Sequence, residues 1–142
     1  MGKLAHILKE KTERAERYNR LLAEVEFLQT PCIPDGCVHS YQSYVCLFRP
    51  ESPTLDNLVK LHNQRNGLME NLEEQGISTR QGTHAVHSLG YYKKKYSIKE
   101  ADFPNSFIAD RLSLTLPLYA QMTAEEQDYV VEAMKLRNGK IK

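Results

Sequence analysis

Residues 37–49 read CVHSYQSYVCLFR, and this stretch sets the class of fold that the rest of the chain completes. It is rich in β-branched, aromatic and small residues and has no internal glycine or proline, a composition typical of a β-strand. We therefore expect a long strand whose second half is buried more deeply than its first half. Such a strand needs partner strands and a covering layer of helices.

The residues before this strand predict one long helix from residue 3 to about residue 28. Apolar residues recur there at near-helical spacing, with Lys, Glu and Arg between them. These apolar positions are Leu4, Ile7, Leu8, Ala15, Tyr18, Leu21, Leu22, Val25 and Leu28. The runs Thr30-Pro31 and Ile33-Pro34-Asp35-Gly36 then end the helix and turn the chain.

A second helix is expected after the strand. Ser52 or Thr54 can cap it, and Pro53 suits its first turn. Its buried stripe is predicted to consist of Leu55, Leu58, Val59, Leu68, Met69 and Leu72. Gly76 is well placed to end the helix in a left-handed conformation.

The remaining residues predict two further strands and a final helix. Residues 77–80 read as a short strand, and residues 112–116 alternate with period two until Pro117 ends the pattern. Between them we expect a loop, a helical segment at residues 91–96 and a turn or short helix from Phe103. A capping box at Thr123 and Glu126 opens the last helix. Its apolar positions are Tyr129, Val130, Ala133, Met134 and Leu136, and it fades at Asn138-Gly139.

The predicted fold class is therefore α+β. It consists of a small, mainly antiparallel three-stranded sheet, helices packed on one face of that sheet, and a long N-terminal helix. A length of 142 residues is that of a single domain.

Charge and composition exclude several classes of partner. Lys and Arg number 19 and Asp and Glu number 18, so no strong field concentrates nucleic acid or anionic membrane. No apolar run approaches the roughly 20 residues of a membrane helix, and the N-terminus is too charged for a signal peptide.

Three closely spaced cysteines, Cys32, Cys37 and Cys46, do not form a disulfide framework, which fits a reducing cytoplasm.

The stretch GISTRQGTHAVHSLGYY, residues 76–92, contains the most chemically interesting side chains. The pair His84 and His87 lacks the third ligand and supporting partner that a zinc site needs, and loop histidines are more often bonded to backbone. Cys32-x4-Cys37-x-His39 fits neither zinc spacing nor a redox pair, so we expect buried or half-buried thiols there. Tyr91–Tyr96 suits stacking, but on a neutral protein it favours a solvated helix face; contact with one ligand phosphate remains open.

No motif for catalysis is present in the sequence. We find no G-x-S-x-G, no P-loop, no G-x-G-x-x-G and no H-E-x-x-H. Each lysine lies in a charged stretch, without the apolar surroundings that would suit it to Schiff-base chemistry. The residues alone therefore predict a loop with hydrogen-bond donors and acceptors, and no catalytic, cofactor-binding or metal-binding residue.

Two long segments, GISTRQGTHAVHSLGYYKKKY and DFPNSFIADRLSLTLPLYAQMTAEEQDYVVEAM, closely resemble the C-terminal part of the DegT/DnrJ/EryC1/StrS aminotransferases. KLAHILKEKTERAERYNRLL resembles the helix that leads from the large domain of this family into the small one. HSYQSY resembles the first strand of the small domain and LTLPLYAQMT its third. The resemblance covers essentially all 142 residues. It implies a C-terminal small domain, in which residues 1–30 form the interdomain helix and residues 31–142 the small α+β unit.

The family resemblance implies a pyridoxal-phosphate-dependent aminotransferase acting on nucleotide-linked keto-sugars, in polysaccharide or secondary-metabolite sugar biosynthesis. In this family the large domain carries the Schiff-base lysine, and no motif of that domain matches here. The resemblance thus implies a chain that lines the substrate pocket, binds no cofactor by itself and is inactive alone. The full-length enzyme would be a homodimer that binds a nucleotide-sugar.

The same resemblance implies a set of substrate-binding residues. The loop after the Gly-Ile step frames the sugar-nucleotide pocket in this family, and many members have a histidine at the position of Gly82. We expect His84 to replace that side chain through a kink at Gly82, since glycine tolerates positive φ. The implied set is Gly82, Thr83, His84, His87 and Tyr91, with Thr83 and His84 contacting substrate and His87 mainly structural.

Two other functions fit the same residues. The chain could be a stand-alone module that binds a nucleotide-sugar through this loop without chemistry. It could also be a dimerisation module in which the apolar stripe of residues 4–28 pairs with a partner helix.

Overall fold

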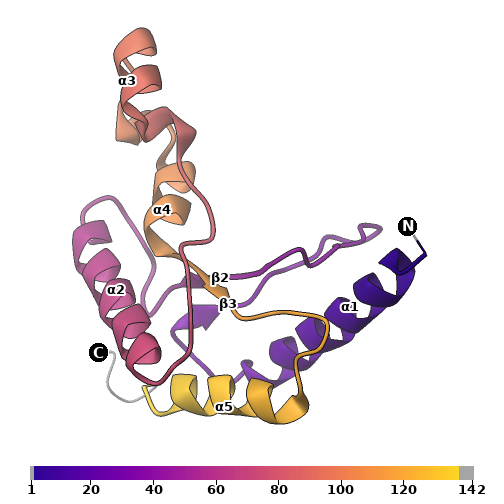
Figure 1. The fold of residues 1–142 in the computed structure, drawn as a ribbon. Helices are drawn as coiled ribbons and strands as arrows, with labels where there is room; N and C mark the ends of the chain where they lie inside the picture. Colours follow the sequence, from indigo (N-terminus) through magenta and orange to yellow (C-terminus); the bar gives the residue numbers. More distant parts are fainter. Residues whose placement is uncertain (1, 138–142) are drawn as a thin grey trace.

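The computed structural model describes residues 2–137 and is built around a three-stranded antiparallel sheet (Figure 1). The strands are β1 (Leu28–Gln29), β2 (Tyr44–Phe48) and β3 (Ser113–Leu116), in the order β1-β2-β3. The helices are α1 (Leu4–Leu21), α2 (Leu58–Glu74), α3 (Gly90–Tyr96), α4 (Pro104–Leu112) and α5 (Ala124–Lys135), with 3-10 turns at Val86–Ser88 and Glu100–Asp102. The α+β class predicted from the sequence is confirmed.

Pairing of β2 with β3 gives the sheet one buried face. The register places Tyr44 opposite Leu116 and Cys46 opposite Leu114. Burial alternates along β2, where Tyr44, Cys46 and Phe48 are buried and the residues between them are half-buried. Because side chains alternate between the two faces of a strand, these residues share one face and enter the core together.

Helices α1, α2 and α5 cover this face and contribute their buried residues to the same core (Figure 1). The Tyr18 ring of α1 lies 5.0 Å from the Tyr44 ring of β2. Both hydroxyls have partners, since Tyr18 donates to the Pro117 carbonyl at 3.1 Å and Tyr44 to Asn19 Oδ1 at 2.6 Å. Burial raises the pKa of both tyrosines, so they remain neutral donors.

Two predicted helix ends are confirmed in their hydrogen bonds. Gly76 has φ +75°, its N–H donates to the Glu73 carbonyl at 2.8 Å, and the Ile77 N–H reaches the Leu72 carbonyl at 2.8 Å. This is the glycine-ended helix terminus that satisfies the last carbonyls. At the start of α5, Thr123 and Glu126 form the reciprocal capping box, with distances of 2.8 and 3.1 Å.

The first helix is shorter than predicted. It ends at Leu21, and turns at Val25 and Leu28, closed by bonds to the Leu22 and Val25 carbonyls, lead into β1. Leu28 then pairs with Phe48 instead of continuing the helical stripe. The apolar spacing near residue 28 therefore reflects an edge strand, which a helical period alone cannot distinguish over so few residues.

The strand predicted over residues 37–49 is regular only from Tyr44 to Phe48. Tyr41 has φ 44°, and its N–H donates to His39 Nδ1 at 2.9 Å, which interrupts extended backbone before the sheet begins. Residues 30–43 instead form an arm that runs out beside α1 (Figure 1), where Lys11 Nζ donates to the Gln42 carbonyl at 2.7 Å. Cys32 and Cys37 lie on this arm and are exposed, so the prediction of buried thiols there is wrong.

Residues 77–80 do not form the predicted strand. Arg80 makes a single antiparallel bridge with Thr115, and the third strand of the sheet is β1. Helix α2 also begins later than predicted, at Leu58, because Thr54 and Asn57 bond to each other in a turn.

Seven of the apolar positions that the helical patterns identified are exposed in the structure: Leu4, Ile7, Leu8, Leu55, Val59, Tyr129 and Leu136. The predicted fading at Asn138-Gly139 lies outside the described residues. Across residues 2–137, no helix has the length and apolar character that a bilayer span requires.

Truncating the β3 residue opposite Cys46 should weaken the whole fold. Leu114 is fully buried, so Leu114→Ala is expected to lower the free energy of unfolding by about 2–5 kcal/mol through lost apolar burial and a residual cavity. The measurement is urea denaturation followed by circular dichroism. Leu4→Ala is the control, because Leu4 is 53% exposed and should change stability by no more than about 0.5 kcal/mol. Equal effects of the two substitutions would contradict the assigned core.

Candidate functional site

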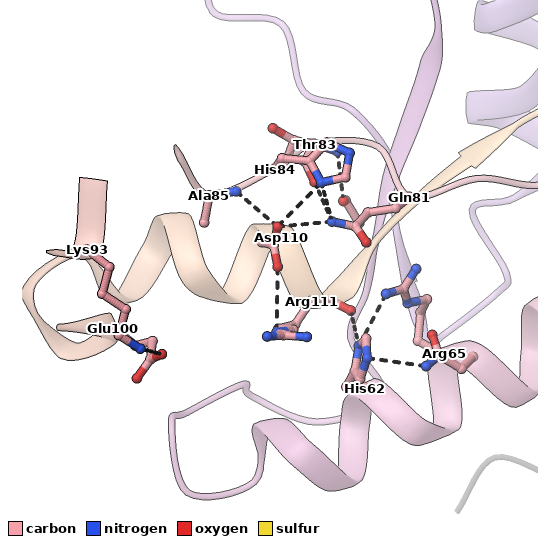
Figure 2. Close-up of polar contacts among 12 residues, drawn as sticks. His62, Arg65, Gln81, Thr83, His84, Ala85, Lys93, Glu100, Asp110 and Arg111 are labelled. Carbon is pink, nitrogen blue, oxygen red and sulfur yellow. Dashed lines mark hydrogen bonds and ion pairs between the residues drawn. The ribbon is translucent and has the colours of Figure 1, made fainter. Parts of the chain in front are cut away.

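The candidate site is the loop of residues 81–85, whose polar contacts are drawn in Figure 2. It packs on Val45 and Ser113, which belong to the face of the sheet opposite the buried side chains of β2 and β3. It begins beside β3, because the bridge between Arg80 and Thr115 delivers the chain to that edge. In β3, Leu114 and Leu116 point into the core, so Ser113 and Thr115 point to the other face. The loop therefore meets side chains that the helices do not cover.

Ser113 binds the first part of the loop. Its hydroxyl oxygen accepts from the Gly82 N–H at 3.0 Å and from the Thr83 N–H at 3.1 Å. The residue is 3% exposed, although it is on the outward face of the sheet, because the loop covers it. Two backbone donors that would otherwise need water are thus satisfied by one side chain.

Asp110, in the last turn of α4, binds the rest of the loop (Figure 2). Its Oδ1 accepts from Gln81 Nε2 and from the Ala85 N–H, each at 3.0 Å, and lies 3.8 Å from His84 Nδ1. Its Oδ2 lies 3.5 Å from Arg111 Nε. Together with Ser113, this carboxylate fixes the loop at both of its ends.

Gly82 packs against β2 at a distance that only glycine permits. A Cβ at this position would lie 2.3 Å from Val45 Cγ1 and 3.2 Å from Ser113 Cβ. The positive-φ glycines among the described residues are Gly36 and Gly76, so the predicted kink at Gly82 through positive φ is wrong. The glycine is needed for close approach of backbone to the sheet.

Thr83 and His84 are the loop residues left available to a ligand. Both are exposed, and the His84 side chain is 74% exposed while its Nδ1 lies 3.1 Å from Gln81 Nε2. Ala85, by contrast, is buried. The loop therefore presents one hydroxyl and one imidazole from a backbone that is held in place.

His87 and Tyr91 have other surroundings. The His87 ring lies 5.2 Å from the Phe103 ring and 6.4 Å from the Phe107 ring. Tyr91 lies in α3, where Lys95 Nζ donates to its hydroxyl at 3.0 Å. The structure brings Gly82, Thr83 and His84 together but gives His87 and Tyr91 separate partners.

Helix α2 supports α4 from the side away from the loop (Figure 2). His62 Nδ1 lies 2.9 Å from the Arg111 carbonyl oxygen and 3.2 Å from Arg65 Nη2, so the His62 ring contacts both α4 and its own helix. The neighbouring Arg65 is 2% exposed, and burial lowers the pKa of its guanidinium while the charge of Asp110 opposes this effect. The turn that carries Asp110 is thereby fixed from two sides.

Three residues of the site were not predicted from the sequence: Gln81, Asp110 and Ser113. Asp110 and Ser113 lie 25 to 31 residues from the loop groups they bind. The period-two pattern of residues 112–116 did indicate that Ser113 points away from the core. Nothing in the sequence indicated which segment would cover it.

Two kinds of side-chain arrangement bear on a metal or cofactor anchor in the described part of the chain: clusters of metal ligands and enclosed lysines. Within residues 2–137, no group of three or more His, Cys, Asp or Glu side chains is placed to hold a metal ion. None of the lysines in that range is buried. The site can therefore bind and orient a polar ligand through hydrogen bonds.

Comparison with known sequences identifies relatives along almost the whole chain. Residues 1–135 match the model of the DegT/DnrJ/EryC1/StrS aminotransferase family. The chain is 31% identical over 134 residues to the uncharacterised protein MJ1066 of Methanocaldococcus jannaschii. It is also 31% identical over 136 residues to the spore coat polysaccharide biosynthesis protein SpsC of Bacillus subtilis. These matches cover 94% and 95% of this chain and 33% of each relative, so the chain spans about a third of their length.

Solved structures show the same fold. Spr1654 of Streptococcus pneumoniae, assigned as a sugar aminotransferase, matches with a TM-score of 0.81 at 20% identity. The match covers 99% of this chain and 33% of that one. Spr1654 has been solved in an apo-form, a PLP-form and a PMP-form.

Adding a methyl group at Gly82 should strain the contact with β2. We expect Gly82→Ala to lower the free energy of unfolding by about 1–3 kcal/mol, because the new Cβ overlaps Val45 Cγ1. In a Val45→Ala background the same change should cost less, by about 0.5 kcal/mol or more, since the overlapping atom is gone. Gly90→Ala is the matched control, because a Cβ there meets no atom within 4 Å. Identical costs in both backgrounds, measured by urea denaturation, would refute the close approach.

Removing the Asp110 carboxylate should release the second half of the loop. Asp110→Ala leaves the buried Ala85 N–H without an acceptor, which is expected to cost about 1–3 kcal/mol. Hydrogen exchange of the Ala85 amide should accelerate more than exchange in α1. Asp56→Ala, at an exposed aspartate before α2, should leave both quantities unchanged. Retained protection of Ala85 in Asp110→Ala would show that another group holds the loop.

Proposed function

The chain belongs to the DegT/DnrJ/EryC1/StrS aminotransferase family, and we propose that it is the small domain of a pyridoxal-phosphate-dependent sugar aminotransferase acting on nucleotide-linked keto-sugars. In this proposal residues 1–30 lead in from a large domain and residues 31–142 form the small domain. The observation that carries the proposal is the family match over residues 1–135, which includes the 81–85 loop and both elements that bind it.

The loop geometry supports a role as one wall of the substrate pocket. Thr83 and His84 project from a backbone fixed by Ser113 and Asp110, so their hydrogen-bonding groups have a set direction. A sugar carries several hydroxyl and carbonyl oxygens that such groups can bind. We assign Thr83 and His84 to substrate contact, Gly82 to the close packing that sets the loop, and His87 and Tyr91 to its flank.

The lysines of residues 2–137 do not fit the anchor that a resident pyridoxal phosphate needs. That cofactor needs an enclosed lysine, and every lysine in residues 2–137 is exposed or half-exposed. When bound, pyridoxal phosphate supplies the aldehyde carbon that accepts and releases the amino group. We place its anchor in the large domain and assign no chemical step to residues of this chain, which should be inactive alone.

The start of α1 supports an interface with further protein. Leu4, Ile7 and Leu8 lie on this helix and are all exposed, although they form part of its apolar stripe. Solvent-exposed clusters of this kind mark interaction surfaces. We propose that they face the large domain or the second subunit of a cytoplasmic homodimer. The same observation favours the second candidate function, a dimerisation module without chemistry.

Purified chain should neither anchor the cofactor nor turn over substrate. We expect incubation with pyridoxal phosphate and borohydride to give no stoichiometric adduct at a single lysine, because none of the lysines in the described part of the chain is enclosed. Peptide mass spectrometry is the measurement. Scattered partial labelling of exposed lysines, equal in native and urea-unfolded chain, is the expected background. A defined adduct, or amination of a keto-sugar by the chain alone, would overturn the proposal.

Titration of the nitrogen-15-labelled chain with UDP-glucose distinguishes the small domain of a larger enzyme from a stand-alone module that binds a nucleotide-sugar. The small domain of a larger enzyme should show little binding, because most of the pocket is supplied elsewhere. Saturable shifts confined to residues 80–92 would instead establish a stand-alone nucleotide-sugar module. His84→Ala should then weaken that binding by about tenfold or less, the loss expected for one hydrogen bond, while His6→Ala on α1 should leave it unchanged.

A further inference from the structure

The side-chain amide of Gln81 has only one orientation in this loop. Its Nε2 lies 2.8 Å from the Thr83 carbonyl oxygen and 3.0 Å from Asp110 Oδ1 (Figure 2). Both oxygens can only accept hydrogen bonds, so the amide nitrogen, and not the amide oxygen, faces them. The two N–H groups of the amide are shared among these two oxygens and His84 Nδ1, which also lies near the amide nitrogen.

The same nitrogen decides which form of His84 fits the loop. His84 Nδ1 lies 3.1 Å from Gln81 Nε2. A hydrogen on Nδ1 would be directed at a group that itself donates, and an amide nitrogen has no lone pair free to accept it. Neutral His84 must therefore keep Nδ1 unprotonated and carry its hydrogen on Nε2.

The charge beside the loop restricts the ligand atom that this Nε2–H can meet. The Asp110 carboxylate lies 3.8 Å from His84 Nδ1 and 3.5 Å from Arg111 Nε, and its charge also acts on Arg65 on the side away from the loop. A phosphate bound at His84 would be repelled by that carboxylate across a short distance. An uncharged oxygen of a sugar accepts a hydrogen bond without this repulsion.

We infer that Gln81 is a positioning residue that fixes His84 as an outward Nε2–H donor, and that the loop thereby binds an uncharged carbonyl or hydroxyl oxygen of the sugar. This inference rests on the proposed role of the loop as a pocket wall. It assigns a function to Gln81, a residue that makes no contact with ligand in the proposal. It also places the diphosphate of a nucleotide-sugar away from His84.

The first test reads the tautomer of His84 directly. Two-bond proton–nitrogen correlation spectra of the ligand-free, nitrogen-15-labelled chain are recorded at about pH 8.5, where an ordinary imidazole is neutral. The chain has five histidines, and His84→Gln assigns the signal by its loss. We expect the pattern of a ring protonated at Nε2. The pattern of a ring protonated at Nδ1 would overturn the inference.

The second test removes the polar partner of Nδ1. A ratio of Nε2–H to Nδ1–H that does not change when Gln81 is replaced would assign Gln81 a purely structural role. Gln81→Met should lower the ratio of Nε2–H to Nδ1–H about fivefold, the effect of losing one hydrogen bond. Gln42→Met, at an exposed glutamine of the arm, should have no effect.

The third test concerns the ligand atom. Addition of inorganic pyrophosphate should shift the His84 ring signals no more than those of His6, an exposed histidine on α1. A saturable shift specific to His84 would overturn the assignment of an uncharged acceptor. The tautomer of His84 is measured without ligand, so a result against Nε2–H would overturn this inference and leave the proposed function intact. A defined cofactor adduct would overturn the proposed function, but it would not change the tautomer assigned to His84.

Discussion

The antiparallel pairing of β2 with β3 is the constraint on which the other features depend. Its register places Leu114 and Leu116 beside Cys46 and Tyr44 on the face that the helices bury. The same register turns Ser113 to the opposite face, where it binds the 81–85 loop. A slip of one residue would exchange the two faces, exposing the leucines and burying the serine in the apolar core. Stability and site geometry are therefore set by one pairing.

Features governed by local chemistry could be predicted from the sequence. The strand pattern of residues 112–116, the glycine that ends α2 and the capping box of α5 each depend on residues within one or two turns. The glycine and the capping box are confirmed, and the strand is confirmed over Ser113–Leu116, whereas Leu112 ends α4. Features governed by residues distant in the chain could not be predicted from the sequence. Leu28 continues a helical spacing but pairs with Phe48 in the sheet. Residues 77–80 have a strand-like composition, but only Arg80 among them forms a β-bridge, with Thr115.

The candidate site shows the same division. The 81–85 loop was identified by its glycine, threonine and histidine, but the reason for the glycine was not. Gly82 is required because the loop crosses Val45 at close range, which depends on a strand almost forty residues earlier in the chain. The role of Asp110 could not be predicted from the sequence for the same reason, since a carboxylate near the end of a helix has many common roles. Only the fold shows that it gathers Gln81 and Ala85 at one oxygen.

The attachment of the loop at both ends has a consequence for affinity. Ordering the backbone of a residue costs about 1–2 kcal/mol in conformational entropy, and a segment that orders only on contact subtracts this cost from its binding energy. In this chain Asp110 and Ser113 hold the loop as soon as α4 and β3 form. The loop is thus preorganised, and a ligand bound there would have only the exposed Thr83 and His84 side chains to immobilise.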